Sequence, residues 1–502
     1  MGYETRSFTP REYQKRIFET TKKRNTLICL PTGTGKTKNA ILLAVHHLNE
    51  YPEEKVVILS PTKPLAKQIC EEFKECTTIE PEAIMMLTGM KKPVERAEIF
   101  EQSKIVVATP QTIENDAVAK RISLANVCLL VVDECHRSKQ RFANTAVARM
   151  YQEQRKSGRI LALTASPGAT KEKVEEVCKN LFIEDVEMRT EEDEDVAPYI
   201  QQKKVEYRKL WLTPSLQKIQ AELKNMYKEQ VMMLTPYGLY KPAQYLNKKD
   251  LLLLQQRFQR EIEKGNSAGY SGVSKVAQVI KMLYLLELIE TQTPKAALDY
   301  LRKMETESSR AAKAILNDKR IKNIKVSVEA LVQTGAQHPK MGEIKRIVQQ
   351  KLHERENAKT IIFANYRATV DELYDLLKEV EKAKPVRLTG QSKGFSQQDQ
   401  LDLIEKFNQD EYNVLITTSI GEEGISIGSL DVAIFYDQTG SEIRKIQRTG
   451  RVGRVKAGEI IHLITKGTRD EALLWTSMRK EKRMHNILGS MKRKMETQAK
   501  LT

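Results

Sequence analysis

A repeated alternation between short apolar runs and amphipathic stretches is the feature of this sequence that most constrains its fold. The runs are rich in β-branched residues, and a Gly, Pro, Ser, Thr or Asp closes them. Parallel strands that are buried between crossover helices have this pattern. The alternation occurs before residue 190 and again after residue 340, so the sequence predicts two doubly wound α/β lobes with parallel sheets. The predicted strands are Thr26–Leu30, Val56–Ser60, Ile84–Leu87, Ile105–Thr109, Cys128–Val132, Ile160–Thr164, Thr360–Ala364, Val386–Leu388, Val414–Thr417, Val432–Tyr436 and Ile460–Ile464.

Between the two lobes the pattern changes to that of helices. Thr213 and Thr293 are each followed by Pro, and a Thr N-cap with Pro at the first helical position marks a helix start. Apolar residues then recur at helical spacing after both positions and also over residues 273–288. We therefore expect a first lobe at residues 1–195, an all-helical domain at 196–335 inserted between the lobes, a second lobe at 336–470, and a basic C-terminal helix or tail at 471–502.

The positive charge of the chain is concentrated in two of these parts. The net charge is +17, and residues 201–340 hold 25 Lys and Arg against 13 Asp and Glu. Residues 471–502 hold 8 against 3, and the rest of the chain is balanced. A localised basic excess indicates a polyanionic partner, most often nucleic acid. Taken alone, the charge fits solvated, lysine-rich helix faces equally well.

Membrane and secretory functions do not fit the sequence. The longest apolar runs, such as Val127–Val132, are far shorter than the ~18–20 residues that span a bilayer. The first residues, Met1–Arg16, are polar and lack the apolar centre of a signal peptide. The six cysteines contain no C-x-x-C pair, which fits neither a zinc knuckle nor an iron–sulfur cluster. Cys29 and Cys128 lie in apolar runs and are expected to be core thiols in a reducing cytosol.

A glycine-rich loop, Pro31–Thr37, follows the first predicted strand and precedes an amphipathic helix. Glycines let backbone N–H groups turn toward phosphates, and the N-terminus of the next helix favours anions. Lys36 would reach the β- and γ-phosphates of ATP, and Thr37 would bind Mg²⁺. Leu30 stands where the strict motif has its first Gly, so the strand–loop–helix context carries this prediction against a chance glycine-rich turn. The expected nucleotide-binding residues of the loop are Thr32, Gly33, Thr34, Gly35, Lys36 and Thr37.

An acidic pair, Asp133 and Glu134, follows the predicted strand at Cys128–Val132. An Asp at the carboxyl end of a parallel strand points into the ligand crevice. We expect Asp133 to hold Mg²⁺ through water and Glu134 to orient and activate the attacking water. A lone D-E-x-H could be an ordinary loop start, but its pairing with the loop at Lys36 favours the catalytic interpretation. The sequence has no H-E-x-x-H pattern, which disfavours a metalloprotease.

A third element, Gln447–Arg454, lies in the second predicted lobe and spaces two arginines around glycines. It could be a basic turn that contacts only solvent. In the functional interpretation, Arg451 and Arg454 are arginine fingers that reach the γ-phosphate across a cleft, with Gln447 in the same catalytic segment. Such a finger stabilises transition-state charge by ~10³–10⁵ in rate. Hydrolysis would then depend on the closure of the two lobes.

These elements together resemble the motifs of superfamily 2 helicases of the DEAH/DECH type over essentially the whole chain. Arg11–Gln14 looks like the adenine-reading Q element, Pro31–Thr37 like motif I, Asp133–His136 like motif II in its DECH form, Thr164–Ser166 like motif III, Thr417–Gly424 like motif V and Gln447–Arg454 like motif VI. The resemblance implies two RecA-like lobes, ATP and Mg²⁺ as cofactors, and Gln14 as an adenine contact. It also implies that motif III couples the ATP site to the nucleic-acid site.

A narrower resemblance is to the archaeal Hef helicase region, which is related to the FANCM-type fork-remodelling helicases. It rests on Gly421–Gly424, Gly467–Ala472 and the helical domain. In that family the helical domain lies between the RecA-like lobes and binds branched DNA. The resemblance implies an ATP-dependent DNA helicase or translocase that acts on forked or branched DNA in replication-fork repair, with 3′-to-5′ polarity. With DNA as its partner, and with the cysteine and apolar-run arguments above, we expect a cytoplasmic, nucleoid-associated protein without membrane contact.

Several strand-end loops resemble the nucleic-acid contacts of this family. Small hydroxyl residues and backbone N–H groups suit phosphate contacts that do not read sequence. For any single Ser or Thr an ordinary turn or helix cap fits as well, so the prediction depends on the set. The residues expected to contact nucleic acid are Thr62, Lys63, Thr109 and Gln111 in the first lobe, Arg367, Gln391 and Thr418 in the second, and Lys248, Lys249, Arg257 and Arg260 in the helical domain.

Two other functions remain open at the level of sequence. RNA-sensing and Dicer-type helicases share the two lobes, the DECH form and a helical insertion, and they would be activated by double-stranded RNA. The sensors carry a Cys-rich zinc domain, and this chain has no Cys after Cys178, which disfavours that class. A non-enzymatic scaffold that binds branched DNA is disfavoured because Lys36, Asp133, Glu134 and both arginines are intact.

Overall fold

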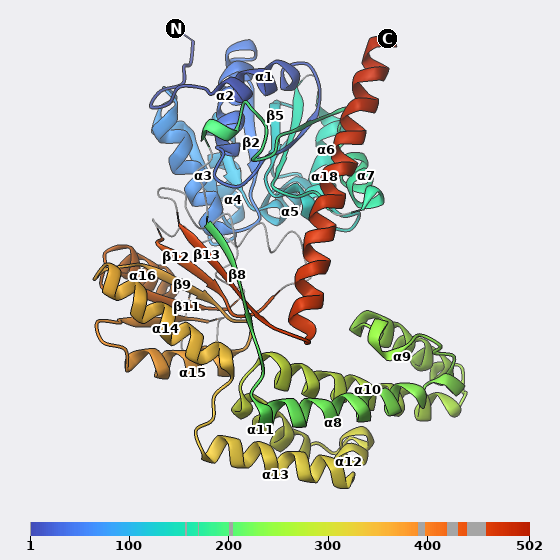
Figure 1. Ribbon diagram of the computed structural model, residues 1–502. Helices are drawn as coiled ribbons and strands as arrows, with labels where there is room; N and C mark the ends of the chain where they lie inside the picture. Colours follow the sequence, from blue (N-terminus) through green and yellow to red (C-terminus); the bar gives the residue numbers. More distant parts are fainter. Residues whose placement is uncertain are drawn as a thin grey trace.

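The computed structural model describes residues 2–155, 158–168, 170–199, 204–389, 397–418, 430–438 and 458–501 of the 502-residue chain (Figure 1). Two α/β lobes lie one above the other, and a separate group of helices extends beneath and beside the second lobe. A long C-terminal helix runs from the junction of these parts up along the first lobe. The predicted fold class, two parallel-sheet lobes with a helical domain inserted between them, is therefore confirmed.

The first lobe is a parallel sheet with the strand order β3-β4-β2-β5-β6-β1-β7, counted over the described residues. Its central strands are buried along their whole length, which explains their continuous apolar runs. All the strands predicted for this lobe are confirmed, and one edge strand, β7, was not predicted. The elements are α1 (Glu12–Thr21), β1 (Thr26–Cys29), α2 (Lys36–Glu50), β2 (Lys55–Leu59), α3 (Lys63–Cys76), β3 (Ile84–Leu87), α4 (Pro93–Gln102), β4 (Ile105–Ala108), α5 (Pro110–Val118), β5 (Val127–Val132), α6 (Ala143–Gln154), β6 (Arg159–Thr164), α7 (Lys171–Asn180) and β7 (Asp185–Met188).

The second lobe is a parallel sheet with the strand order β10-β11-β9-β12-β13-β8 over the described residues. Its predicted strands are confirmed. Strand β8 was not predicted, and it corrects the expected boundary at residue 196, because it pairs with β13 although it precedes the helical domain in the chain. The elements are β8 (Lys204–Leu210), α14 (Pro339–Glu354), β9 (Thr360–Phe363), α15 (Arg367–Lys378), β10 (Pro385–Leu388), α16 (Gln397–Asn408), β11 (Val414–Thr417), β12 (Val432–Phe435) and β13 (Glu459–Thr465).

The helical domain packs around one apolar core that is separate from the cores of the lobes. Thr213 and Thr293 are N-caps whose hydroxyls accept hydrogen bonds from the backbone, as the Thr-Pro signals predicted. The long helix α10 occupies the centre and contacts its neighbours on several sides (Figure 1). The helices are α8 (Pro214–Met232), α9 (Lys248–Glu263), α10 (Ala268–Thr291), α11 (Pro294–Glu305), α12 (Arg310–Leu316) and α13 (Lys319–Gln333).

The expected C-terminal helix is present as α18 (Arg469–Leu501), but it does not stand apart as a tail. It begins beside β13 and α10 and then packs on β7 and α7 of the first lobe. Met484, Leu488 and Met491 of α18 belong to the buried core of that lobe. One helix therefore touches all three parts of the molecule.

A buried polar joint fixes the second lobe to the helical domain and to the start of α18. The ammonium group of Lys340 is fully buried, 2.6 Å from an oxygen of Asp470 and 2.7 Å from the carbonyl oxygen of Tyr436. Gln292 of the helical domain donates a hydrogen bond to Asp437, and Thr369 donates one to Gln292 at 2.7 Å. These buried polar groups satisfy one another's hydrogen-bonding capacity away from solvent, so we expect the joint to be rigid.

His338 lies beside this joint, and its ionisation makes the stability of the folded protein depend on pH. Its Nε2 lies 3.2 Å from the carbonyl oxygen of Glu290, and burial together with the charge of Lys340 lowers the pKa of His338 to about 3. An unfolded chain has a His pKa of ~6.5, so between these values the unfolded state binds a proton that the folded state does not. Stability is therefore complete above pH ~6.5 and is lost as the pH falls toward 3.

We expect His338 alone to cost about 2 kcal/mol of stability at pH 5 relative to pH 7.5. Thermal unfolding of the wild type and of His338→Asn at both pH values measures this contribution, because Asn keeps an N-cap acceptor and does not titrate. The difference between the two pH values should shrink in the variant. An equal difference in both proteins would contradict the assignment.

The burial of the cysteines agrees with the prediction made from the sequence. All six cysteines are buried and free, so Cys29 and Cys128 are core thiols as predicted. Across the part of the chain that the structure describes, no helix combines the length and the apolarity that crossing a membrane requires.

Candidate active site

Three loops of the first lobe meet at the carboxyl edge of its sheet. Strand β6 lies between β5 and β1, so the loops after these strands are neighbours. They are Pro31–Gly35 after β1, Asp133–Glu134 after β5 and Thr164–Ser166 at the end of β6. The fold thus brings together the predicted motifs I, II and III at the sheet edge where parallel α/β sheets generally bind their ligands.

The glycine-rich loop after β1 is shaped by two residues with left-handed backbone angles. Gly33 has φ +82° and Gly35 has φ +77°, a conformation that side chains rarely adopt. Gly35 is also the N-cap of α2, so the loop leads directly into the positive end of a helix dipole. Lys36, the first residue of α2, lies with its Nζ 3.4 Å from the carbonyl oxygen of Leu30, directly after β1. The loop therefore has the backbone geometry of an anion site.

Asp133 and Glu134 are a closely coupled pair of carboxylates next to Lys36. Burial and the charge of Glu134 raise the pKa of Asp133 to about 7, and the charge of Lys36 opposes this. Burial also acts to raise the pKa of Glu134, but the hydrogen bond and charge of His136, with the charges of Lys36 and Arg137, outweigh it and lower that pKa. Glu134 is therefore the carboxylate that stays ionised and able to accept a proton.

The backbone and side chain of Glu134 are both held in place. Its φ of +48° is in the left-handed region, which is strained for a residue with a side chain. Oε2 of Glu134 lies 3.2 Å from Nδ1 of His136, and the same ring nitrogen lies 3.4 Å from the hydroxyl oxygen of Thr164. Strained residues of this kind persist where surrounding contacts determine their position, and they are frequent in active sites.

The Q-like element packs against the phosphate loop from the other side. The Tyr13 hydroxyl donates a hydrogen bond to the carbonyl oxygen of Thr34, and Gln14 donates one to the carbonyl oxygen of Gly35 at 3.4 Å. Both side chains are buried. The guanidinium of Arg11 lies 4.6 Å from the centre of the Tyr199 ring, within the range of a cation–π contact.

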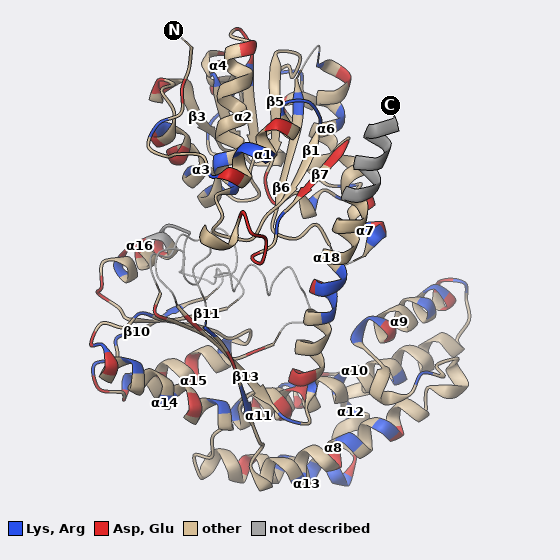
Figure 2. Cartoon of the chain, turned by 45° about the horizontal axis from the view of Figure 1, so that its top comes forward, with Lys and Arg blue, Asp and Glu red and all other residues tan. Residues whose placement is uncertain are grey.

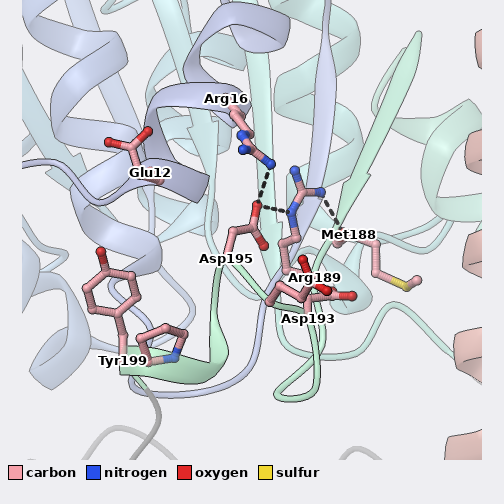
Figure 3. Close-up of a pocket in the computed structure, with 9 residues that line it drawn as sticks. Glu12, Arg16, Met188, Arg189, Asp193, Asp195 and Tyr199 are labelled. Carbon is pink, nitrogen blue, oxygen red and sulfur yellow. Dashed lines mark hydrogen bonds and ion pairs between the residues drawn. The ribbon is translucent and has the colours of Figure 1, made fainter.

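The acidic run at residues 191–195, which the sequence suggested as a linker or lobe edge, folds back on this element. Asp195 accepts from Arg189 at 3.2 Å and from Arg16 of α1 at 3.5 Å (Figure 3). With Glu12 and Tyr199 these residues line a cavity of about 700 Å³. Asp195 thereby joins this run to α1 and to Arg189, directly after β7.

The predicted nucleic-acid positions of the first lobe lie at the same edge of the sheet, after β2 and β4. Thr62 is the N-cap of α3 and accepts from the backbone of Leu65 at 3.5 Å, so it also has the structural role that the sequence left open. The hydroxyl oxygens of Thr109 and Thr112 are 2.9 Å apart, and Gln111 between them is exposed. Lys63 is partly exposed at the start of α3.

In the second lobe, Arg367 is exposed at the start of α15, and Thr418 is almost fully buried directly after β11. Both follow the carboxyl ends of strands, like their counterparts in the first lobe. Other predicted site residues, Gln391, Gln447, Arg451 and Arg454, and motif V beyond Thr418, lie outside the described residues.

The basic residues predicted in the helical domain lie on α9. Lys248, Lys249, Arg257 and Arg260 are all exposed, and Figure 2 shows basic and acidic residues side by side on this helix. Arg257 is paired with Glu261 at 3.3 Å. Arg320 of α13 differs, because it is held by Asp318 and Glu229, each at 2.9 Å, and joins α13 to α8.

Sequence reasoning missed three residues that the fold adds to the site. His136 was quoted as part of a motif, but its contacts with Glu134 and Thr164 depend on the pairing of β5 with β6. Tyr199 comes from a segment far along the chain, and nothing in the local sequence placed it beside Arg11. Asn39 donates to the carbonyl oxygen of Gly35 at 3.4 Å, and its position one helical turn after the loop was an available signal.

Three known families match consecutive parts of the chain. The DEAD/DEAH box helicase family matches residues 11–174, a putative ATP-dependent RNA helicase helical bundle matches 215–338, and the helicase conserved C-terminal domain matches 340–456. Among solved structures, the crystal structure of the Pyrococcus furiosus Hef helicase domain is 39% identical in sequence with a TM-score of 0.74. The match covers 93% of this chain and 98% of that one.

Curated relatives include a putative ATP-dependent RNA helicase of Methanocaldococcus jannaschii, 36% identical over 96% of this chain and 61% of its own length. The ATP-dependent DNA helicase mph1 of Neurospora crassa is 31% identical over 92% of this chain and 41% of its own. The ATP-dependent DNA helicase fml1 of Schizosaccharomyces pombe is 30% identical over 91% and 57%. The chain thus spans less than two thirds of the length of these three relatives.

Proposed function

Because the chain belongs to the helicase family of the Pyrococcus furiosus Hef helicase domain, with FANCM-type relatives, we propose that it is a DNA-stimulated ATPase that unwinds or remodels forked DNA. The observation that carries the proposal is the arrangement of Lys36, Asp133 and Glu134 at one sheet edge, with Glu134 held ionised beside His136. The proposed setting is replication-fork repair, with 3′-to-5′ translocation.

In the proposed mechanism, the phosphate loop binds ATP and Lys36 neutralises the β- and γ-phosphates. Glu134 orients the attacking water and accepts its proton, because its lowered pKa keeps it ionised. Arg451 and Arg454 of the second lobe, with Gln447 in the same motif, would stabilise the charge of the transition state. Hydrolysis then requires lobe closure, and a cycle of closure and opening moves the protein along the strand.

Mg²⁺ would be held by the hydroxyl of Thr37 and the carboxylate of Asp133. Both donors are oxygens, which Mg²⁺ prefers. Burial raises the pKa of Asp133 and thereby disfavours its ionised form. The positive charge of a bound cation would act in the opposite direction and favour the carboxylate. When bound, Mg²⁺ neutralises phosphate charge during phosphoryl transfer.

The helical domain is proposed to select the DNA structure. The exposed lysines and arginines of α9 would contact the backbone of a duplex arm while the sheet-edge loops hold the translocated strand. Backbone contacts of this kind release counterions, so binding should depend steeply on salt.

The test of the function is a comparison of ATP hydrolysis rates with single-stranded DNA, duplex DNA, a fork, a four-way junction and duplex RNA. We expect the fork and the junction to stimulate hydrolysis more than duplex DNA or duplex RNA. The paired variant Lys248→Ala/Lys249→Ala should weaken fork binding and reduce the slope of log affinity against log salt by up to about 2.

A matched control neutralises two other exposed lysines of the same domain, in the variant Lys313→Ala/Lys322→Ala. These are exposed on α12 and α13, and both views draw α13 on the other side of α10 from α9 (Figures 1 and 2). Fork binding should keep most of its salt dependence in this control. Equal losses in both variants would show that only total charge matters and would refute a specific role of α9.

Two alternatives have distinct outcomes in the same assay. The match of residues 215–338 to an RNA helicase helical bundle favours RNA as the second candidate, and stronger stimulation by duplex RNA than by any DNA would establish it. A non-enzymatic scaffold would show no stimulation by any nucleic acid while still binding branched DNA.

A further inference from the structure

The long helix α18 is anchored at its start in two parts of the molecule. Asp470 pairs with the buried Lys340 of the second lobe at 2.6 Å. Arg469 pairs with Glu287 of the helical domain at 2.8 Å, and its backbone N–H donates to Glu290 at 3.1 Å. The first turn of α18 therefore moves with the second lobe and the helical domain.

Further along, the same helix is part of the first lobe. Met484, Leu488 and Met491 are buried in the core of that lobe, against β7 and α7. The Ser166 hydroxyl of the motif III segment donates a hydrogen bond to Sδ of Met484 at 2.8 Å. Both residues are fully buried, so this polar contact is sheltered from water. A thioether is a weak acceptor, and burial leaves the hydroxyl few alternatives.

From Ser166 a short series of contacts leads to the carboxylate beside the phosphate loop. The backbone N–H of Ser166 donates to the hydroxyl oxygen of Thr164 at 3.0 Å. That oxygen lies 3.4 Å from Nδ1 of His136, which lies 3.2 Å from Oε2 of Glu134. Each contact joins the next without a gap, from α18 to Glu134.

We infer that Met484 is a positioning residue for ATP hydrolysis. It fixes Ser166, and through Thr164 and His136 it fixes Glu134, according to where the second lobe and the helical domain hold α18. The inference rests on the proposed function. A nucleic acid that moves the helical domain relative to the first lobe would thereby change the position of the residue that activates water, in addition to any effect of lobe closure.

The first test uses Met484→Leu, which keeps the volume of the side chain and removes the sulfur acceptor. We expect the DNA-stimulated kcat to fall about 5-fold with the KM for ATP unchanged, a change of about 1 kcal/mol. Met491→Leu is the matched control, because Met491 is in the same helix and the same core, about two turns further along. It should keep the wild-type rate, and an equal loss in both variants would overturn the inference.

A double-mutant cycle then asks whether the contact with Ser166 carries the effect. If it does, Ser166→Ala/Met484→Leu has the same kcat as Ser166→Ala alone, because the second substitution removes nothing further. Losses that multiply would show independent effects and would refute the proposed route.

A measurement without nucleotide separates this inference from the proposed function. In Met484→Leu we expect amide hydrogen exchange of the free protein to accelerate several-fold at Ser166 and over residues 133–138, and to stay unchanged in Met491→Leu. Unchanged exchange at these amides in Met484→Leu would overturn the inference. If wild-type ATPase shows no response to any nucleic acid, the proposed function fails, and the exchange result still decides whether Met484 positions this segment.

Discussion

Replacing Glu134 with Gln is expected to lower nucleic-acid-stimulated ATP hydrolysis by about 10²–10⁴-fold, the usual contribution of a general base. Gln fills the same space but cannot accept the proton of the attacking water. The side chain already has the required state, because His136, Lys36 and Arg137 lower the pKa of Glu134 against the effect of burial. Steady-state hydrolysis with forked DNA measures the loss.

The same variant should bind both ATP and DNA with near wild-type affinity, because no phosphate ligand is removed. Lys36→Ala should also abolish stimulated hydrolysis and spare DNA binding, since Lys36 lies in the phosphate loop. Glu98→Gln is a suitable control, because Glu98 is exposed on α4 of the same lobe. Wild-type turnover in Glu134→Gln would show that another group activates the water.

Replacing Asp470 with Asn is expected to destabilise the junction of the second lobe, the helical domain and α18 by about 3–5 kcal/mol. The substitution keeps the shape of the side chain but leaves the buried ammonium of Lys340 without its negative partner. The loss should appear as a lower midpoint of thermal unfolding and as faster proteolysis near the start of α18.

An exposed ion pair provides the comparison. Lys345 and Glu379 lie 3.3 Å apart on the surface of the second lobe, so Glu379→Gln should change stability by less than about 1 kcal/mol. Replacing both members of the buried pair, as in Lys340→Met/Asp470→Leu, should recover part of the loss, because neither member is left as a lone charge. Recovery should be incomplete, because the charge of Lys340 also lowers the pKa of the buried Asp437. A mild effect of Asp470→Asn would mean that solvent reaches Lys340.

The central strands could be predicted from sequence because each is buried on both faces and therefore apolar throughout, as in Val127–Val132. The two missed strands, β7 and β8, are at sheet edges. Asp185 and Glu187 interrupt the apolar pattern of β7, and charged residues dominate β8. Their pairing is set by partners distant in the chain, which no local pattern reports.

The residues of the candidate site also fall into two groups, those that the local sequence predicted and those that depend on the tertiary fold. The phosphate loop and the acidic pair were predictable because each is a short segment whose chemistry depends on neighbours in the chain. The contacts of His136, Tyr199 and Met484 were not, since each joins segments that only the tertiary fold brings together. The course of α18 over the first lobe also depends on packing, because the sequence predicted only a basic C-terminal helix or tail for this segment.

Strand β8 has a consequence for how the protein is made. It leaves the ribosome before the helical domain, yet its partner β13 begins about 250 residues later, between Leu210 and Glu459. At roughly 5–20 residues per second, β8 waits on the order of tens of seconds with its hydrogen-bonding groups unpaired. Its charged residues, Lys204, Glu206, Arg208 and Lys209, suit this interval, because charges on an unpaired strand discourage pairing with the wrong chain. The helical domain, with a core of its own, is free to fold while β8 waits. The sheet of the second lobe is therefore completed after the helical domain, and the first lobe gains the buried residues of α18 later still.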